Sequence, residues 1–252
     1  MSACYPRPRM NRDLQLALQL ADAAVAITMR WFRSANLQVR TKSDKTPVSA
    51  ADEETEEMIR ATLQRERPGD GIVGEEFGVS GESSRRWIID PIDGTKNYVR
   101  GIPVFATLIA LEENGRIAAG VVSSPAMSKR WWASRDEGAF SNGEAIRVSQ
   151  TATIEEAFLS SYALTEPYLT LARRSRRPCA FSDFWAHMLV AEGGLDIAVE
   201  PRLAPWDMAP LQIIVEEAGG RFTDVRGNAH YDGGSGLSTN GLLHDAVLEA
   251  LR

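Results

Sequence analysis

The chain has 252 residues, 44% of them hydrophobic, and a formal net charge of −6. This length suffices for one large α/β domain or two closely packed subdomains, and it excludes a small scaffold that depends on disulfide bonds or metal ions for its stability. The acidic balance argues against nucleic-acid binding, because nucleic-acid-binding domains usually carry a basic excess.

The cysteines and the N-terminal stretch give no sign of export. Cys4 and Cys179 belong to no Cys-x-x-Cys pair, so we expect two free thiols in a reducing compartment. The stretch MSACYPRPRM lacks a signal-peptide core, and no segment approaches the roughly 18 apolar residues of a membrane span. We therefore expect a cytoplasmic protein without membrane contact.

The first part of the chain predicts two helices followed by one continuous sheet. Apolar side chains from Leu14 to Val25 recur at helical spacing, which predicts an amphipathic helix over 13–33. A second helix is predicted from Ser49, its N-cap, to Arg67. Short apolar runs separated by Gly-containing turns then predict strands at 72–73, 87–89, 106–111, 117–123, 130–133 and 138–140.

The second part alternates strands with helices. Strands are predicted at 157–160 and 195–199, and helices at 185–192, 205–218 and 242–251. The basic run 173–177 is interpreted as the solvated end of a helix stopped by Pro178, with an anion or partner contact as the alternative. No linker separates the parts, so we expect an α+β subdomain over 1–150 packed against an α/β subdomain over 151–252.

Several features that resemble chemical motifs are given structural interpretations. The stretch 69–74 matches G-x-G-x-x-G, but a predicted helix precedes it and two glutamates follow, which does not suit a dinucleotide. His187, His230 and His244 lack ligand spacing and are interpreted as surface or packing residues. No G-x-S-x-G motif supports a serine hydrolase.

The stretch WIIDPIDGT at 87–95 ends an apolar run with two aspartates. Asp90 follows a predicted buried strand, at the sheet edge where open α/β sheets bind ligands. Pro91 interrupts the strand pairing, so that the Ile92 carbonyl can turn into the same space as Asp93. Charged side chains here need a positive partner, because burying an unpaired carboxylate is costly.

Other segments supply the same kind of group. Gly94-Thr95 opens a short predicted helix whose free N–H groups suit a phosphate, Glu75 ends a short strand, and Asp207 begins a helix. Carboxylates about 4 Å apart repel by roughly 4 kcal/mol per pair. Oxygen-only ligands favour Mg²⁺ or Mn²⁺ over Zn²⁺ as the compensating charge. Alternatively, each acid caps its own helix or turn.

Together these segments resemble the inositol monophosphatase family. The matching segments are KSDKTPVSAAD at 42–52, GEE at 74–76, WIIDPIDGT at 87–95 and Trp206-Asp207 before a helix ending in EAGG at 217–220. The resemblance implies an α/β (α+β) fold, the layered αβαβα sandwich of the inositol monophosphatase and fructose-1,6-bisphosphatase type. It also implies a Mg²⁺-dependent phosphatase, often a homodimer, that hydrolyses small-molecule phosphate esters by metal-activated water.

The resemblance further implies roles for single residues. One Mg²⁺ would be held by Glu75, Asp90 and the Ile92 carbonyl, and a second by Asp90, Asp93 and Asp207, with two to three ions in all and Mn²⁺ as a possible substitute. Asp52, Glu75 and Thr95 would be catalytic, with Asp52 accepting a hydrogen bond from the Thr95 hydroxyl. Asp93 and the backbone N–H groups of Gly94 and Thr95 would bind the substrate.

Within that family the chain most resembles the actinobacterial-type histidinol-phosphate phosphatases of histidine biosynthesis. The features are Lys96 and Arg100 after the 87–95 stretch, Ser182-Asp183-Phe184 before the helix predicted at 185–192, and Glu200-Pro201. One departure is that those enzymes usually have Gly-Asp where this chain has Ser182-Asp183. Asp183 and Glu200, with Asn97, would recognise the cationic end of histidinol phosphate. Inositol 1-phosphate and related sugar or nucleotide phosphates are alternative substrates. A protein-binding regulator with a vestigial metal site is the alternative of another class.

Overall fold

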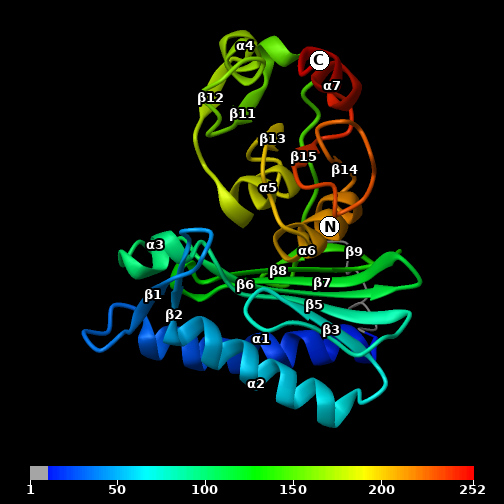
Figure 1. The fold of residues 1–252 in the computed structure, drawn as a ribbon. Coiled ribbons are helices and arrows are strands. Elements are labelled where there is room, and N and C mark those ends of the chain that lie inside the picture. The colour runs from blue at the N-terminus through cyan, green and yellow to red at the C-terminus, as the bar shows by residue number, and fades with distance from the viewer. Residues whose placement is uncertain (1–10) are drawn as a thin grey trace, which may run out of the picture.

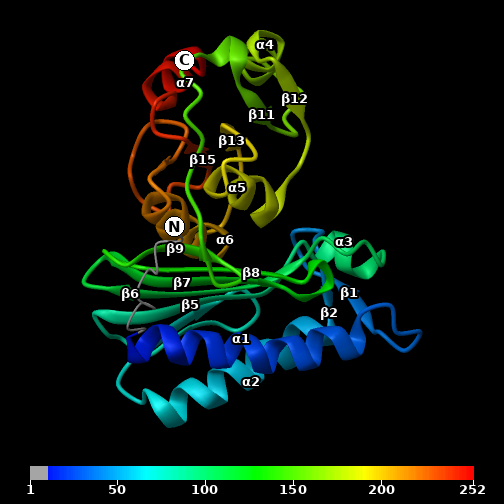
Figure 2. The same ribbon diagram turned by 180° about the vertical axis from the view of Figure 1, so that it is seen from behind.

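The computed structural model describes residues 11–252 as five alternating layers of helix and sheet (Figure 1). Helices α1 and α2 cover one face of an eight-stranded sheet, and α5 and α6 cover the other face. A five-stranded sheet follows, with α4 and α7 on its outer side, and the reverse view shows the same order (Figure 2). This is the αβαβα sandwich expected from the sequence.

The helices are α1 (Arg12–Trp31), α2 (Ala50–Glu66), α3 (Thr95–Val99), α4 (Tyr168–Arg174), α5 (Asp183–Ala191), α6 (Pro205–Glu217) and α7 (His244–Ala250). The eight-stranded sheet has the order β10-β9-β8-β7-β6-β5-β3-β4. Its strands are β3 (Gly71–Gly74), β4 (Gly78–Ser80), β5 (Arg85–Asp93), β6 (Ala106–Glu113), β7 (Arg116–Ser124), β8 (Lys129–Ser134), β9 (Gly138–Ser141) and β10 (Glu144–Ala145). Among the strands described in this sheet, β3 and β5 are the one pair that runs parallel.

The five-stranded sheet has the order β12-β11-β13-β15-β14. Its strands are β11 (Phe158–Ser160), β12 (Arg177–Cys179), β13 (Ile197–Glu200), β14 (Arg221–Thr223) and β15 (Gly236–Thr239). A separate hairpin pairs β1 (Val39–Thr41) with β2 (Pro47–Ser49). The predicted strands and helices are all present, whereas β1, β2, β4, β10, β12, β14 and β15 were not predicted.

Helix starts follow their capping residues. The Asn11 side chain accepts a hydrogen bond from Leu14 N at 2.7 Å at the start of α1. Ser49 caps α2 as predicted, and Asp52 completes a capping box by accepting a hydrogen bond from Ser49 N at 2.8 Å. The cap fixes where α2 begins and thereby orients the Asp52 carboxylate.

The largest hydrophobic core lies between the eight-stranded sheet and helices α5 and α6. Residues before and after 150 contribute to it, among them Trp131, Phe184 and Met208. Each such fully buried large side chain contributes about 1.5–3 kcal/mol. A Cβ on Gly120 of β7 would lie 3.0 Å from the Pro210 Cα, so α6 approaches the sheet where only glycine fits. Because this core joins residues from both parts of the chain, the division into subdomains at residue 150 stays a prediction.

The interpretation of the basic run is wrong in one respect. Helix α4 ends at Arg174, and Arg177–Cys179 forms β12, so Pro178 lies in a strand and does not stop the helix. An edge strand tolerates proline because its outer side needs no ladder hydrogen bond. Arg173 pairs with Glu166 and Arg174 with Glu155 at exposed positions, as expected of a solvated helix end.

The remaining structural interpretations have simple outcomes. A turn, not a helix, follows β3, so the 69–74 stretch lacks the geometry of a dinucleotide site. His187 and His244 are buried packing residues, and His230 lies at the surface. Cys179 is a free thiol, and Cys4 lies outside the described residues. Within residues 11–252, no helix is both long and apolar enough to cross a membrane.

Candidate active site

The carboxyl end of β5 departs from regular strand pairing. The register between β5 and β6 shifts between Asp90 and Asp93, around Pro91. The Pro91 carbonyl accepts a hydrogen bond from the Thr107 hydroxyl at 2.9 Å, and Asp90 Oδ1 accepts one from Ile92 N at 2.9 Å. As predicted, proline interrupts the ladder, which brings both aspartates to one side of the strand end.

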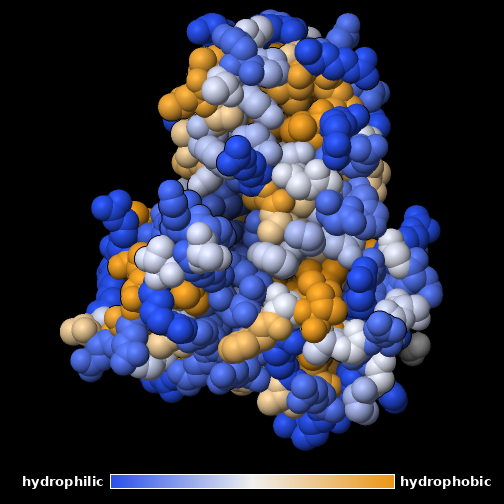
Figure 3. All heavy atoms as spheres, in the orientation of Figure 1, coloured by the Kyte–Doolittle hydropathy of each residue, from blue (hydrophilic) through white to orange (hydrophobic). Residues whose placement is uncertain are grey.

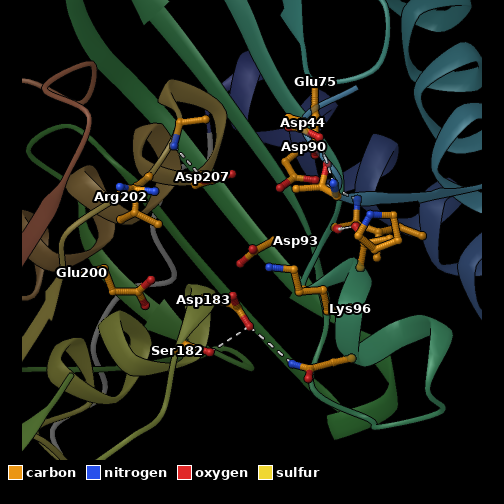
Figure 4. Close-up of a pocket in the computed structure, with 18 of the residues that line it drawn as sticks. Asp44, Glu75, Asp90, Asp93, Lys96, Ser182, Asp183, Glu200, Arg202 and Asp207 are labelled. Carbon is orange, nitrogen blue, oxygen red and sulfur yellow. Dashed lines mark hydrogen bonds between the residues drawn. The ribbon is translucent and has the colours of Figure 1, made fainter. Parts of the chain in front are cut away.

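Asp207 joins these two aspartates from the other part of the chain. One carboxylate oxygen from each of Asp90, Asp93 and Asp207 lies within 4.8 Å of the others, and Figure 4 shows the three side chains around a common space. Asp207 also accepts a hydrogen bond from Ala204 N at 2.8 Å at the start of α6. Asp207 therefore caps α6 and also joins the acidic cluster, so its capping role does not argue against a shared site.

Burial and mutual repulsion disfavour the charged forms of these acids. Burial, together with the negative charges of Glu75 and the other aspartates, raises the pKa of Asp90 well above its ordinary value. Burial and neighbouring carboxylates raise the pKa of Asp93 likewise, and burial raises the pKa of Asp207 to about 7. A divalent cation would reverse this cost, since it supplies positive charge to oxygen-only donors.

Glu75 lies in the turn after β3, on the Asp90 side of the cavity (Figure 4). Its Oε1 is 2.8 Å from the ammonium nitrogen of Lys42, which is also 2.7 Å from Glu76 Oε1. Sequence reasoning assigned no role to Lys42, although it begins the 42–52 segment. The ammonium group neutralises part of the acidic cluster from the β1–β2 side.

Gly94, Thr95 and Asp52 meet beside the aspartates. Gly94 has a φ of +82°, and a Cβ there would lie 2.9 Å from the Val104 carbonyl oxygen, so glycine is required. The Thr95 hydroxyl is 2.9 Å from the Ile92 carbonyl and 3.2 Å from Asp52 Oδ1, two acceptors for its single proton. Burial raises the Asp52 pKa to about 6.

Three residues predicted to bind the substrate line the same space, next to Asp93, whose Oδ2 accepts a hydrogen bond from Phe184 N at 2.7 Å, directly after Asp183. Asn97 donates from Nδ2 to Asp183 Oδ2 at 3.3 Å, and Asp183 has a φ of +58° at the start of α5. Glu200 ends β13 and is 2% exposed. Its Oε1 has no hydrogen-bond partner among the described residues and lies 3.9 Å from His187 Nε2, which has none either. Burial raises the pKa of Glu200 well above its ordinary value.

A cavity of about 760 Å³ connects these groups. It is lined by every predicted site residue except Asp52, which reaches the site through Thr95. Figure 3 shows the corresponding hydrophilic hollow between the upper layers and the corner formed by α3 and β1. The lining also includes residues that sequence reasoning missed: Asp44, Thr46 and Pro47 of the β1–β2 hairpin, with Tyr162 and Arg202. Arg202 follows β13 closely, which was a signal available from the sequence.

Comparisons with known proteins find relatives that match almost the whole described chain. A model of the family described as "Inositol monophosphatase family" matches residues 10–252. Proteins named histidinol-phosphatase are 49% identical to this chain in Streptomyces coelicolor (94% of this chain, 95% of that protein) and in Mycobacterium tuberculosis (95% and 97%). A solved structure of Thermotoga maritima IMPase TM1415 superposes with a TM-score of 0.86 at 35% identity, covering 96% of this chain and 97% of that chain.

Proposed function

The chain belongs to the inositol monophosphatase family, and from that premise we propose that it is a histidinol-phosphatase, which hydrolyses L-histidinol phosphate to L-histidinol and phosphate. The observation that carries this proposal is a single cavity with two acidic ends. One end holds Glu75 and Asp90, the other holds Asp183 and Glu200, and Asp93 lies between the two (Figure 4). The first suits cations that bind a phosphate, and the second suits a positively charged leaving group.

The first end would hold two to three Mg²⁺ ions, with Mn²⁺ as a possible substitute. Its donors are carboxylate and carbonyl oxygens, which these ions prefer. Glu75, Asp90 and the Ile92 carbonyl would hold one ion, and Asp90, Asp93 and Asp207 a second, whose three oxygens lie within 4.8 Å of one another. When bound, such ions activate water at neutral pH and stabilise charge on the departing oxygen.

The chain's own groups would orient the reactants. Backbone N–H groups of Gly94 and Thr95, at the start of α3, would bind phosphate oxygens. Because its pKa is about 6, Asp52 in the cation-free protein is mostly ionised at pH 7. The carboxylate would then accept the hydrogen bond of the Thr95 hydroxyl, whose oxygen is 3.2 Å from Asp52 Oδ1, and the Thr95 oxygen would be free to accept a hydrogen bond from the attacking water.

The second end would select the alcohol part of the ester. L-histidinol phosphate carries an ammonium and an imidazole, both of which donate hydrogen bonds. The Glu200 carboxylate, which lines the cavity, would accept one of them, and Asp183, held by Asn97, would face the other. Inositol offers only hydroxyl groups, which gain less from buried carboxylates than cations do.

The test is phosphate release, with and without Mg²⁺, from L-histidinol phosphate and inositol 1-phosphate side by side. We expect Mg²⁺-dependent release that is faster from histidinol phosphate. Glu200→Gln keeps the size of the side chain and should lower kcat/KM for histidinol phosphate about tenfold, with less effect on the inositol ester. Faster turnover of the inositol ester would overturn the substrate, and no release from either ester would favour a vestigial site.

The family resemblance also leads us to propose a homodimer, and two cysteines outside any Cys-x-x-Cys pair support a location in the reducing cytoplasm. A homodimer predicts twice the chain mass of 27.7 kDa in light scattering at micromolar concentration. Fractionation of cells from the source organism would test the location.

A further inference from the structure

We propose that Glu56 and Arg60 of α2 are positioning residues that hold Glu75 in its cation-binding orientation from outside the cavity. This inference rests on the cation-binding role of Glu75 in the proposed function. Neither residue lines the cavity, and neither was singled out in the sequence. Glu56 has 0% of its surface exposed and Arg60 has 9%.

Glu56 binds the backbone of the turn that carries Glu75. Its Oε2 accepts a hydrogen bond from Glu76 N at 2.8 Å, and its Oε1 accepts one from Phe77 N at 3.2 Å. These are the two amides that directly follow Glu75 in the chain. A carboxylate that accepts two successive amides fixes the local backbone path, because both donors must point at one side chain.

Arg60 connects Glu56 to the strand beyond the turn. Its Nε donates to Glu56 Oε1 at 2.7 Å, and its two terminal nitrogens donate to Ser80 Oγ at 3.0 Å and to the Gly78 carbonyl. The guanidinium therefore holds both ends of β4 while it compensates the buried charge of Glu56. Such planar, multiply bonded contacts give geometric precision that a single ion pair does not give.

The other side of Glu75 is fixed by the main sheet. Glu75 N donates to the Ile89 carbonyl at 3.2 Å, next to Asp90. Gly74 precedes it, and a Cβ on Gly74 would collide with Glu56 Oε1, so the absence of a side chain there makes room for the Glu56 carboxylate. Glu75 is thus held by β5 on one side and by Glu56 on the other.

A merely structural ion pair is the competing explanation, so the test separates stability from cation binding. Glu56→Gln keeps the size of the side chain but presents an NH₂ group to a set of donors. Glu57→Gln is the matched control, since Glu57 is exposed on the same helix. Arg60→Lys keeps the charge and loses the contacts to β4, and it replaces Glu56→Gln if that variant does not fold.

Two readouts need no activity. Hydrogen–deuterium exchange of the 75–80 segment in the cation-free protein should be faster in Glu56→Gln and unchanged in Glu57→Gln. Mn²⁺ affinity, measured by calorimetry at 25 °C well below the unfolding midpoint, should fall about tenfold or more, as is typical for groups that orient metal ligands. Arg60→Lys should show the same two changes to a smaller degree.

The activity readout is the Mg²⁺ concentration that gives half-maximal phosphate release, which should rise about tenfold while kcat at saturating Mg²⁺ changes little. A lower melting temperature with unchanged Mn²⁺ affinity would overturn the proposal and leave a structural ion pair. If the wild-type protein binds Mn²⁺ but hydrolyses neither ester, the proposed function fails while this inference is still tested. If the wild-type protein binds no Mn²⁺, both fail.

Discussion

Replacing Asp207 by asparagine should abolish most activity and at the same time make the cation-free protein more stable. This combination is unusual, because most substitutions destabilise. It follows from the position of Asp207 beside Asp90 and Asp93, with one oxygen of each within 4.8 Å of the others. Asparagine keeps the side-chain oxygen that accepts the hydrogen bond from Ala204 N at 2.8 Å, so the start of α6 is preserved.

The size of the effect comes from the pKa of Asp207. Two charges about 4.8 Å apart repel by roughly 3–4 kcal/mol at an effective dielectric constant of about 20. Burial is the largest cause that raises the Asp207 pKa from 3.8 to about 7. This rise corresponds to about 4 kcal/mol that the cation-free fold loses when Asp207 ionises. Neighbouring acids can take up a proton instead, so we expect a net gain of about 2 kcal/mol for Asp207→Asn at pH 8.

The direction of the Asp207 pKa shift also determines how the stability of the cation-free protein depends on pH. Because the pKa of Asp207 is higher in the folded than in the unfolded protein, the wild-type protein has its full stability below the unfolded-state pKa. It loses this stability as the pH rises through the folded-state pKa. The advantage of Asp207→Asn should therefore be about 4–8 °C in the unfolding midpoint at pH 8 in EDTA, and should shrink toward zero near pH 4. Asp136→Asn, the same change at an exposed carboxylate, is the control and should shift the midpoint little.

The assay pairs thermal unfolding, with EDTA or with Mg²⁺, with phosphate release from histidinol phosphate. Wild-type protein should gain stability from Mg²⁺ at pH 8, and Asp207→Asn should gain much less. Its kcat/KM should fall at least about a hundredfold, because a lost charged ligand removes several kcal/mol of cation and transition-state stabilisation. Near-normal turnover at saturating Mg²⁺, or a lower cation-free stability at pH 8, would refute the reasoning.

Three further outcomes are expected. Wild-type protein in EDTA should lose unfolding free energy between about pH 4 and pH 7, because burial raises the pKa of Asp52 to about 6 and of Asp207 to about 7; saturating Mg²⁺ should flatten the dependence in denaturant titrations. Thr95→Val should lower kcat about a hundredfold, while Mn²⁺ affinity measured by calorimetry stays within about twofold of wild type. Gly94→Ala should lose most activity, because its φ of +82° and the Val104 carbonyl at 2.9 Å leave no room for a methyl group; a crystal structure with the wild-type loop path would contradict this.

The sequence predicted the parts of the fold that have strong local signals. The long helices α1, α2 and α6 and the apolar strands β5, β6 and β7 combine length with clear periodicity or a capping residue. Strands such as β1, with three exposed residues, and β12, which contains proline, have no such signal. Their strand geometry comes from pairing partners that are distant in the chain, which local pattern cannot supply.

The same limit applies to the site. Asp90, Asp93 and Asp207 could be predicted because each carries its own context, a strand end or a helix start, and because the family motif spans them. Lys42, which contacts Glu75 and Glu76, could not be assigned a role, since an isolated lysine in a polar loop gives no hint of its partners. Glu56 had the same appearance as the exposed Glu57 until the fold placed it behind the 75–77 turn.

The distribution of charge in the cavity limits which esters can bind. A phosphate ester brings negative charge into a cavity lined by seven acidic side chains and two basic ones, Lys96 and Arg202, so its phosphate needs cations at the Asp90 end. The Glu200 carboxylate, which is 2% exposed, then opposes a leaving group that is neutral or negative, because a buried charge without a partner is costly. A leaving group with its own positive charge removes that cost. Specificity for a cationic alcohol would therefore arise from rejection of other esters as much as from contacts with the correct one.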